Sequence, residues 1–390
     1  MLSNRYSGTQ LATIQLLLSI ALSILASSCT HNPPFPSVQI DSSSLLAGQL
    51  FFPGQSVPSV DNPHLLTLTD EMREFVRHHT ATATTEKQKT RAILNAILKE
   101  GTINLQYNLV KTYSARDAYE AREGNCLSFT NLFVALAREA GLNVFYQRVD
   151  IPPTWDEIGG AYIYNLHINA VVDMAPLGRT AVDFDVASFS KQYHMWEVSD
   201  QHAEAQFHNN MGVHRLGKKE FSAAFLHFKR AIEISPDIGY FWTNLGTLYR
   251  RAGHEIHAEH AFLKAIKVAS DPAAMSNLAL LYNSQRKIKQ ARYYNNQVKI
   301  YHSKNPYYQY HLAEKAYAAN EFEKVKDMLE QAIRLRSDDH RFYRLLALAQ
   351  LQTGDIKSAG KNFQQAASKA TSSSDRKKYS HKYDTLTQIR

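Results

Sequence analysis

The stretch 121-AREGNCLSFTNLFVALAREAGL-142 joins a polar loop to an amphipathic segment and contains one of only two cysteines in the 390-residue chain. Asn125 is a favoured helix N-cap residue. Apolar residues then recur at three- and four-residue spacing until Gly141, which is typical of a helix and its C-terminal stop. Cys126 is therefore predicted in the first helical turn, where unpaired N–H groups and the helix dipole favour a thiolate.

A thiol at this place has two possible roles. If a base and an orienting acid lie beside Cys126, the thiolate is a nucleophile. If they do not, a free cysteine is most simply a small buried core residue. The position at a helix start does not decide between the two roles, so the candidate partners have to be found elsewhere in the sequence.

A candidate base follows in the segment 161-AYIYNLHINAVV-172, which alternates between two faces as a β-strand does. The alternation predicts His167 in the middle of the strand, on a polar face between Asn165 and Asn169. Histidine is the side chain best suited to accept a thiol proton near neutral pH. A half-buried structural histidine is the alternative.

Candidate acids follow in 180-TAVDFDV-186, which alternates again and places Asp183 and Asp185 on one face. If the two strands form a hairpin centred near Ala175, His167 lies opposite Asp183. A carboxylate beside a histidine fixes its tautomer and stabilises the imidazolium. Asp185 remains an alternative partner by spacing.

Together these segments resemble the transglutaminase-like superfamily of papain-fold cysteine enzymes over roughly residues 65–195. The resemblance rests on 113-YSARDAYEAREGNCLSFTNLFVALAREAGL-142, followed by "NLHINAVV" and "AVDFD". It implies an α+β papain-like domain in which Cys126 is the nucleophile, His167 the base and Asp183 the orienting acid. It implies no cofactor, and the acids show no metal-loop spacing.

The sequence departs from this family's pattern after the histidine. Many relatives have an aromatic residue there, whereas this chain has Asn169 and Ala170. An oxyanion hole is expected to use the backbone N–H of Cys126. No second donor can be assigned from the sequence.

From about Ala205 the sequence repeats with a period near 34 residues, which predicts a stacked helical array. The clearest unit, 240-YFWTNLGTLYRRAGHEIHAEHAFLKAIKVA-269, resembles a tetratricopeptide repeat (TPR). About five repeats are predicted over residues 205–371, with a capping helix over residues 372–390. The fold class is therefore a papain-like, transglutaminase-like α+β domain followed by an all-α TPR solenoid.

The N-terminus contains a short apolar run, Leu11–Ala26, that reads as a secretory signal. It ends in "LASSC", which resembles the lipobox of bacterial lipoproteins. The resemblance implies a signal peptide over residues 1–28, lipidation of Cys29 and, from Thr30, an outer-membrane location facing the periplasm. An ordinary cleaved signal and an uncut anchor are the alternatives. The Pro- and Ser-rich segment that follows is interpreted as a tether extending to residue 66.

Charge divides the chain. Residues 1–200 contain 14 basic and 19 acidic residues, net −5, and residues 201–390 contain 30 and 17, net +13, which sum to the stated +8. The basic half is either a solvated helical surface or one that recruits an acidic partner. No base-reading motif is evident, so a nucleic-acid partner is not expected.

Three functions are compatible with this organisation. The first is an envelope-anchored cysteine protease, amidase or acyltransferase, whose domain over residues 67–200 acts on amide bonds while the repeats bind a protein or peptide. The second is a catalytically weak scaffold or adaptor lipoprotein whose repeats assemble envelope proteins. The third is a purely structural lipoprotein, which leaves Cys126 unexplained. The sequence does not choose between water and an amine as acyl acceptor.

Overall fold

The structure is a computed structural model that describes residues 35, 41–149, 167–176, 178–184, 195–370 and 372–388, and the backbone of 157–158 and 161–162. The apolar run Leu11–Ala26, Cys29 and Asp185 lie outside these residues. The chain divides into two units, Met1–Gln39 and Ile40–Arg390, and every element described below belongs to the second. No helix among the described residues has the length and apolar character needed to span a membrane.

The transglutaminase-like half is built around one buried helix. Capping residues set the starts of its four helices: Thr69, Thr85, Ser114 and Asn125 each accept a backbone N–H from the first turn. These helices are α3 (Asp70–Thr80), α4 (Glu86–Leu98), α5 (Ala115–Ala121) and α6 (Cys126–Glu139). The predicted cap at Asn125 is thus confirmed.

Strands β3, β6, β7 and β8 form an antiparallel sheet in the order β7-β6-β3-β8. Two further pairs lie outside it: β1 with β2, which is parallel, and β4 with β5. The strands are β1 (Gln106–Tyr107), β2 (Glu123–Gly124), β3 (Asn143–Val149), β4 (Glu157–Ile158), β5 (Ala161–Tyr162), β6 (His167–Asp173), β7 (Arg179–Val182) and β8 (Met195–Val198).

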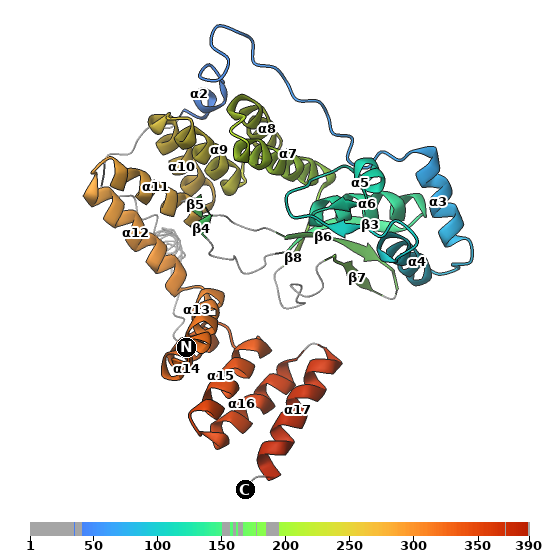
Figure 1. The fold of residues 1–390 in the computed structure, drawn as a ribbon, viewed down its shortest axis with the longest axis vertical. Helices are drawn as coiled ribbons and strands as arrows, with labels where there is room; N and C mark the ends of the chain where they lie inside the picture. Colours follow the sequence, from blue (N-terminus) through green and yellow to red (C-terminus); the bar gives the residue numbers. More distant parts are fainter. Residues whose placement is uncertain are drawn as a thin grey trace, which may run out of the picture. The chain divides into compact units, whose positions relative to one another are not determined.

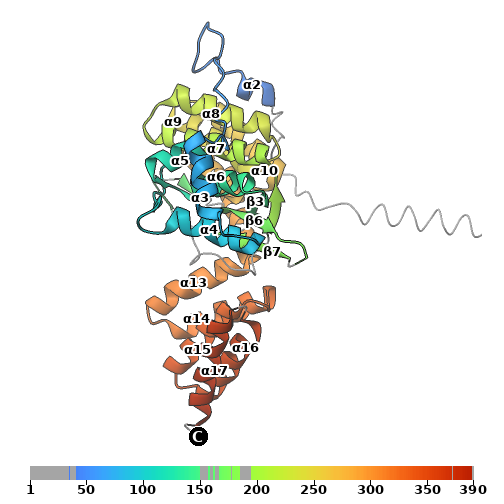
Figure 2. The ribbon, with the colours of Figure 1, turned by 90° about the vertical axis from the view of Figure 1, so that its right-hand side faces the viewer.

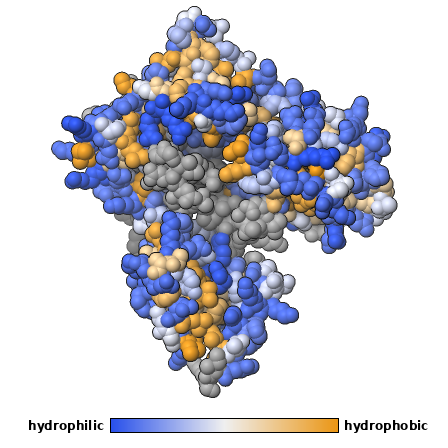
Figure 3. Space-filling model, in the orientation of Figure 1, coloured by the Kyte–Doolittle hydropathy of each residue, from blue (hydrophilic) through white to orange (hydrophobic). Residues whose placement is uncertain are grey.

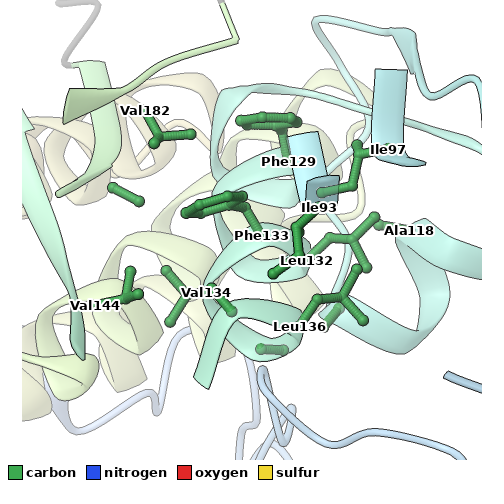
Figure 4. Close-up of a cluster of buried hydrophobic side chains, with 14 of the residues drawn as sticks. Ile93, Ile97, Ala118, Phe129, Leu132, Phe133, Val134, Leu136, Val144 and Val182 are labelled. Atoms are coloured by element: carbon green, nitrogen blue, oxygen red, sulfur yellow. The ribbon is translucent and has the colours of Figure 1, made fainter. Parts of the chain in front are cut away.

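The core of this half lies between α6 and the sheet. Leu132, Phe133 and Leu136 of α6 are fully buried and belong to one cluster with Val144 of β3 and Val182 of β7 (Figure 4). Helices α3, α4 and α5 pack around α6 (Figure 1). Because α6 is held on all these sides, its N-terminal turn has a fixed position.

Helices α7 to α16 form five consecutive antiparallel pairs in the described residues, followed by α17 where the capping helix is predicted (Figure 2). Small residues allow the close packing: a Cβ on Gly212 or Gly246 would lie within 2.7 Å of Phe228 or Phe262 in the partner helix. The bounds are α7 (Asp200–Gly217), α8 (Phe221–Ile234), α9 (Gly239–Arg251), α10 (Glu255–Ala269), α11 (Pro272–Ser284), α12 (Ile288–Ser303), α13 (Pro306–Ala318), α14 (Phe322–Leu335), α15 (His340–Gln352), α16 (Ile356–Lys369) and α17 (Ser373–Gln388).

The segment between the predicted anchor and α3 packs on the repeats. It contains α2 (Ser42–Leu46), where Leu45 is fully buried and its carbonyl accepts a hydrogen bond from Tyr249 Oη at 2.7 Å. The Phe51 ring contacts the rings of Phe225 and Tyr249. The sequence shows apolar residues here, but it does not show the surface that they cover.

Surface polarity follows the pattern expected of such a fold. Hydrophilic side chains cover most of the described surface seen in Figure 3, with hydrophobic side chains in small groups among them. The fold thus fixes the start of α6 and the start of β6, and those two places carry the predicted site.

Candidate active site

The loop that precedes Cys126 is held by a network centred on Ser128. The Ser128 hydroxyl accepts the backbone N–H of Tyr113 at 2.8 Å and lies 3.1 Å from Asn125 Oδ1, which caps α6. Gly124 is required here because a Cβ would lie 2.4 Å from the Cβ of Ser128. The half-buried Cys126 is therefore presented at the first turn of α6 in one defined orientation.

His167 and Asp183 are in direct contact. His167 Nε2 lies 2.8 and 2.6 Å from the two carboxylate oxygens of Asp183, and both side chains are almost completely buried. Since Nε2 is engaged, Nδ1 is the ring nitrogen left for the Cys126 sulfur, which contributes to the raised pKa of His167. Cys126, His167 and Asp183 thus lie together, as the sequence predicts.

The hairpin that joins His167 to Asp183 differs from the predicted one. Ala170 pairs with Val182, so the hairpin is centred on Pro176, one residue beyond the Ala175 centre that places His167 opposite Asp183. The turn runs from Met174 to Gly178, whose carbonyl accepts the Met174 N–H at 3.0 Å. Asp183 therefore lies beyond the last strand pair, and it reaches His167 diagonally.

Residues 163–166 of the predicted strand lie outside the described residues, and β6 is described from His167 onward. The face of β6 that carries His167 is polar but buried, because His167 is 7% exposed and Asn169 is 1% exposed. Sequence alternation identifies the face and gives no information on what covers it.

The electrostatics of His167 are set by its partners. Burial alone disfavours the imidazolium, but the hydrogen bonds with Asp183 and Cys126, and the charges of both, outweigh it. The pKa of His167 is raised to about 10. At neutral pH the ring is therefore an imidazolium that donates to the Asp183 carboxylate and faces the sulfur.

Asn169 follows His167 by two residues in β6. Its Nδ2 donates to Asp183 Oδ2 at 2.8 Å and supplies a second hydrogen bond that orients the acid. Asn169 is not assigned to the site from the sequence alone. Its position two residues after His167, on the same strand face, could have indicated it.

Tyr107 is a residue of the site that sequence reasoning missed. Its phenol oxygen lies 4.0 Å from Cys126 Sγ, and its ring stacks on Phe184 at a centroid distance of 5.6 Å. The pairing of β1 with β2, which sets Tyr107 beside Gly124, brings it there. Nineteen residues separate Tyr107 from Cys126, and no periodicity links them.

The described residues contain no group of three or more His, Cys, Asp or Glu side chains arranged to hold a metal ion. The arrangement described so far is thus a thiol, an imidazole with its carboxylate, and a phenol. These side chains can catalyse acyl transfer.

Comparison with protein families agrees with the order of the two kinds of fold in the chain. The core model of the transglutaminase-like superfamily matches residues 73–197, and two tetratricopeptide-repeat models match residues 240–272 and 310–375. The chain carries a transglutaminase-like core domain followed by tetratricopeptide repeats. The fold class predicted from the sequence is thereby confirmed.

Individual relatives match part of the chain. Superkiller protein 3 of Schizosaccharomyces pombe is 40% identical over 58 residues, which are 15% of this chain and 4% of that protein. The crystal structure of MamA is 19% identical, with a TM-score of 0.24, and covers 42% of this chain and 91% of its own. The pilF protein of Pseudomonas aeruginosa is 13% identical, with a TM-score of 0.25, and covers 48% and 99%.

Proposed function

We propose that this chain is an envelope-anchored cysteine enzyme that hydrolyses or transfers amide bonds of a protein or peptide. In this proposal Cys126 is the nucleophile, His167 the base and acid, and Asp183 the orienting group. The repeats bind the substrate or a partner protein, and lipidated Cys29 anchors the chain to the outer membrane. The observation that carries the proposal is the buried His167, which is paired with Asp183 at 2.6 Å and has its pKa raised by Asp183 and by Cys126.

The mechanism starts from a thiolate and an imidazolium. The sulfur attacks the carbonyl carbon, and a C–S bond forms as the carbonyl becomes an oxyanion. His167 then donates its proton to the leaving amine as the C–N bond breaks, which gives a thioester. Water or an amine attacks the thioester, His167 takes its proton, and the C–S bond breaks to release the acid or the new amide.

The oxyanion needs donors that are already in place. The backbone N–H of Cys126, at the start of α6, is one. We assign the second to the Tyr107 hydroxyl, because it is the side-chain hydroxyl placed next to the sulfur in the described residues. Its stack on Phe184 keeps the phenol there before substrate arrives.

The reactivity of Cys126 towards iodoacetamide tests the proposal without knowledge of the substrate. Alkylation is followed by peptide mass spectrometry, so that Cys29 does not interfere, between pH 5 and 9 in the wild type and in His167→Ala. The expected result is rapid alkylation well below pH 8.5, about where a free cysteine ionises, and its loss in the variant.

Slow alkylation at low pH in both proteins contradicts the enzyme proposal. That result favours the scaffold function, in which the repeats assemble envelope proteins and the papain-like domain is inactive. His78→Ala is the matched control, because His78 lies on α3 and is exposed. It is expected to leave the alkylation profile unchanged.

A further inference from the structure

The third helix pair has an unusual charge pattern. Residues 272–313, which cover α11, α12 and the first half of α13, contain six Lys or Arg residues and not one Asp or Glu. No longer stretch without an acid exists in the sequence. The same residues contain seven of the 21 tyrosines. The net +13 of the repeats is therefore not spread evenly along them.

Helix α12 concentrates this charge on one exposed face. Its buried side faces the array through Ala291 and Tyr294. Its other side is exposed from the first residue to the last, at the spacing of a helical stripe. Ile288 and Ile300, which are 53% and 46% exposed, lie near its two ends. The stripe consists of Ile288, Lys289, Arg292, Asn295, Asn296, Lys299, Ile300 and Ser303.

Nine of the Lys and Arg residues described in the array pair with a carboxylate, and the cations of this stripe are not among them. Arg230, Lys326 and Arg341 each pair with a carboxylate at 2.9 Å or less. Among the described residues no ion pair involves Lys289, Arg292 or Lys299. Like charges three residues apart destabilise a helix slightly, and here no acid compensates them. A helix surface exposed to water requires charged residues, but it does not require that all of them have the same sign.

We propose that the exposed face of α12 binds the surface of an anionic phospholipid bilayer. Lys and Arg side chains are attracted to the negative surface of such a bilayer, and the two isoleucines can enter the boundary between headgroups and acyl chains. The stripe runs along a single helix of 16 residues, about 24 Å long, and a helix surface of that length can lie on a bilayer. An acidic peptide is less favoured because it offers nothing for Ile288 and Ile300 at the two ends.

Lysine footprinting of the full chain tests this binding. The protein is mixed with vesicles of phosphatidylcholine alone or with 30% phosphatidylglycerol by mole (about the anionic fraction that attracts polybasic segments), and acetylation of each lysine is followed by mass spectrometry. Lys289 and Lys299 are expected to be protected about threefold or more on the anionic vesicles. Exposed Lys377, Lys378 and Lys382 of α17 serve as internal controls and are expected to react equally on both.

Single charge reversals separate the stripe from the overall charge. Arg292→Glu is expected to abolish the protection of Lys289 and Lys299, whereas Lys378→Glu, which changes the net charge by the same amount, is expected to retain it. Circular dichroism verifies that both variants are folded. Equal acetylation on both vesicle types, or equal protection of α17, overturns the proposal. Protection by polyglutamate but not by vesicles overturns it in favour of an acidic peptide partner.

Discussion

His167 in the transglutaminase-like domain and His208 in the first helix pair are both buried, at 7% and 1% exposure, but their pKa values shift in opposite directions. The pKa of His167 is raised to about 10, and that of His208 is lowered to about 3. Desolvation disfavours the charged form in both. The difference comes from the neighbours, because His167 faces the carboxylate of Asp183 and His208 faces another histidine, His227.

The first helix pair contains an acid, but that acid is already engaged. Glu204 lies 3.9 Å from His208 Nε2 and accepts a hydrogen bond from Arg230 at 2.9 Å. The positive charges of His227 and Arg230 then add to desolvation and lower the pKa of His208 further. A buried histidine is therefore no sign of a site by itself. Whether a buried histidine is positively charged depends on the availability of a carboxylate beside it.

Loss of the carboxylate at the site is expected to have the largest effect on activity. In Asp183→Asn the imidazolium loses its main stabilising partner, so acylation of Cys126 by p-nitrophenyl acetate is expected to fall by about 10³- to 10⁴-fold. The rate is measured by mass spectrometry of the Cys126 peptide. Asp173→Asn, at the far end of β6, is the control and is expected to retain the wild-type rate. An equal loss in both variants contradicts the assigned role.

The Tyr107 hydroxyl is expected to affect the acylation of Cys126 and not its alkylation. Tyr107→Phe keeps the stack on Phe184 and removes the hydroxyl. Acylation by p-nitrophenyl acetate passes through an oxyanion and is expected to slow about 100-fold. Alkylation by iodoacetamide forms no oxyanion and is expected to change little. Parallel losses in the two rates indicate that Tyr107 positions the sulfur and does not stabilise the oxyanion.

Close packing in the repeats offers a comparison within one helix. In Gly212→Ala the new Cβ lies 2.6 Å from the Phe228 ring, so the free energy of unfolding is expected to fall by about 1–3 kcal/mol. Gly217→Ala, at the end of the same α7, meets no atom within 4 Å and is expected to be neutral or slightly stabilising. Urea unfolding distinguishes the two. Equal stabilities show that the helix pair is not close-packed at Gly212.

The two histidine environments predict opposite pH limits for stability. The unfolded state binds more protons than the folded state at His208 and at His227, whose pKa burial lowers to about 4. Their contribution to stability is therefore present above pH 6.5, about the pKa of an unfolded histidine, and is lost as the pH falls. His167 has the opposite sign, with a contribution present below that pH and lost as it rises towards 10.

This pH dependence is expected to be the smallest effect near pH 7, because the contribution of His167 and those of His208 and His227 change with pH in opposite directions there. Tm is measured between pH 4 and 7 in the wild type and in the double variant His208→Gln with His227→Phe. The variant is expected to show a flatter decline on the acid side. An identical slope in both proteins indicates that other groups dominate acid unfolding.

Much of the fold could be predicted because local patterns specify it. Asn125 and Gly141 mark the ends of α6, and the 34-residue period marks the repeats. The three site residues could be named because each lies in or directly beside an element whose pattern is clear. The remaining features depend on contacts between distant parts of the chain. Leu45 packs against a repeat more than 200 residues away, and Tyr107 reaches Cys126 only through the pairing of two short strands.

The hairpin error has a similar origin. Alternation determines which residues share a face of β6 and β7, but the turn geometry between Met174 and Gly178 determines the register. A shift of the hairpin centre by one residue moved Asp183 from opposite His167 to the diagonal. The contact survived because Asp183 remained on the same face and Asn169 now lies opposite it.

The most direct test of the account is an NMR titration of the histidine ring nuclei in the full chain, with His167, His208 and His227 assigned by substitution. The account predicts that His167 is still an imidazolium at pH 8, whereas His208 and His227 are still neutral at pH 5. A neutral His167 at pH 8 contradicts the thiolate–imidazolium pair and with it the proposed chemistry of Cys126.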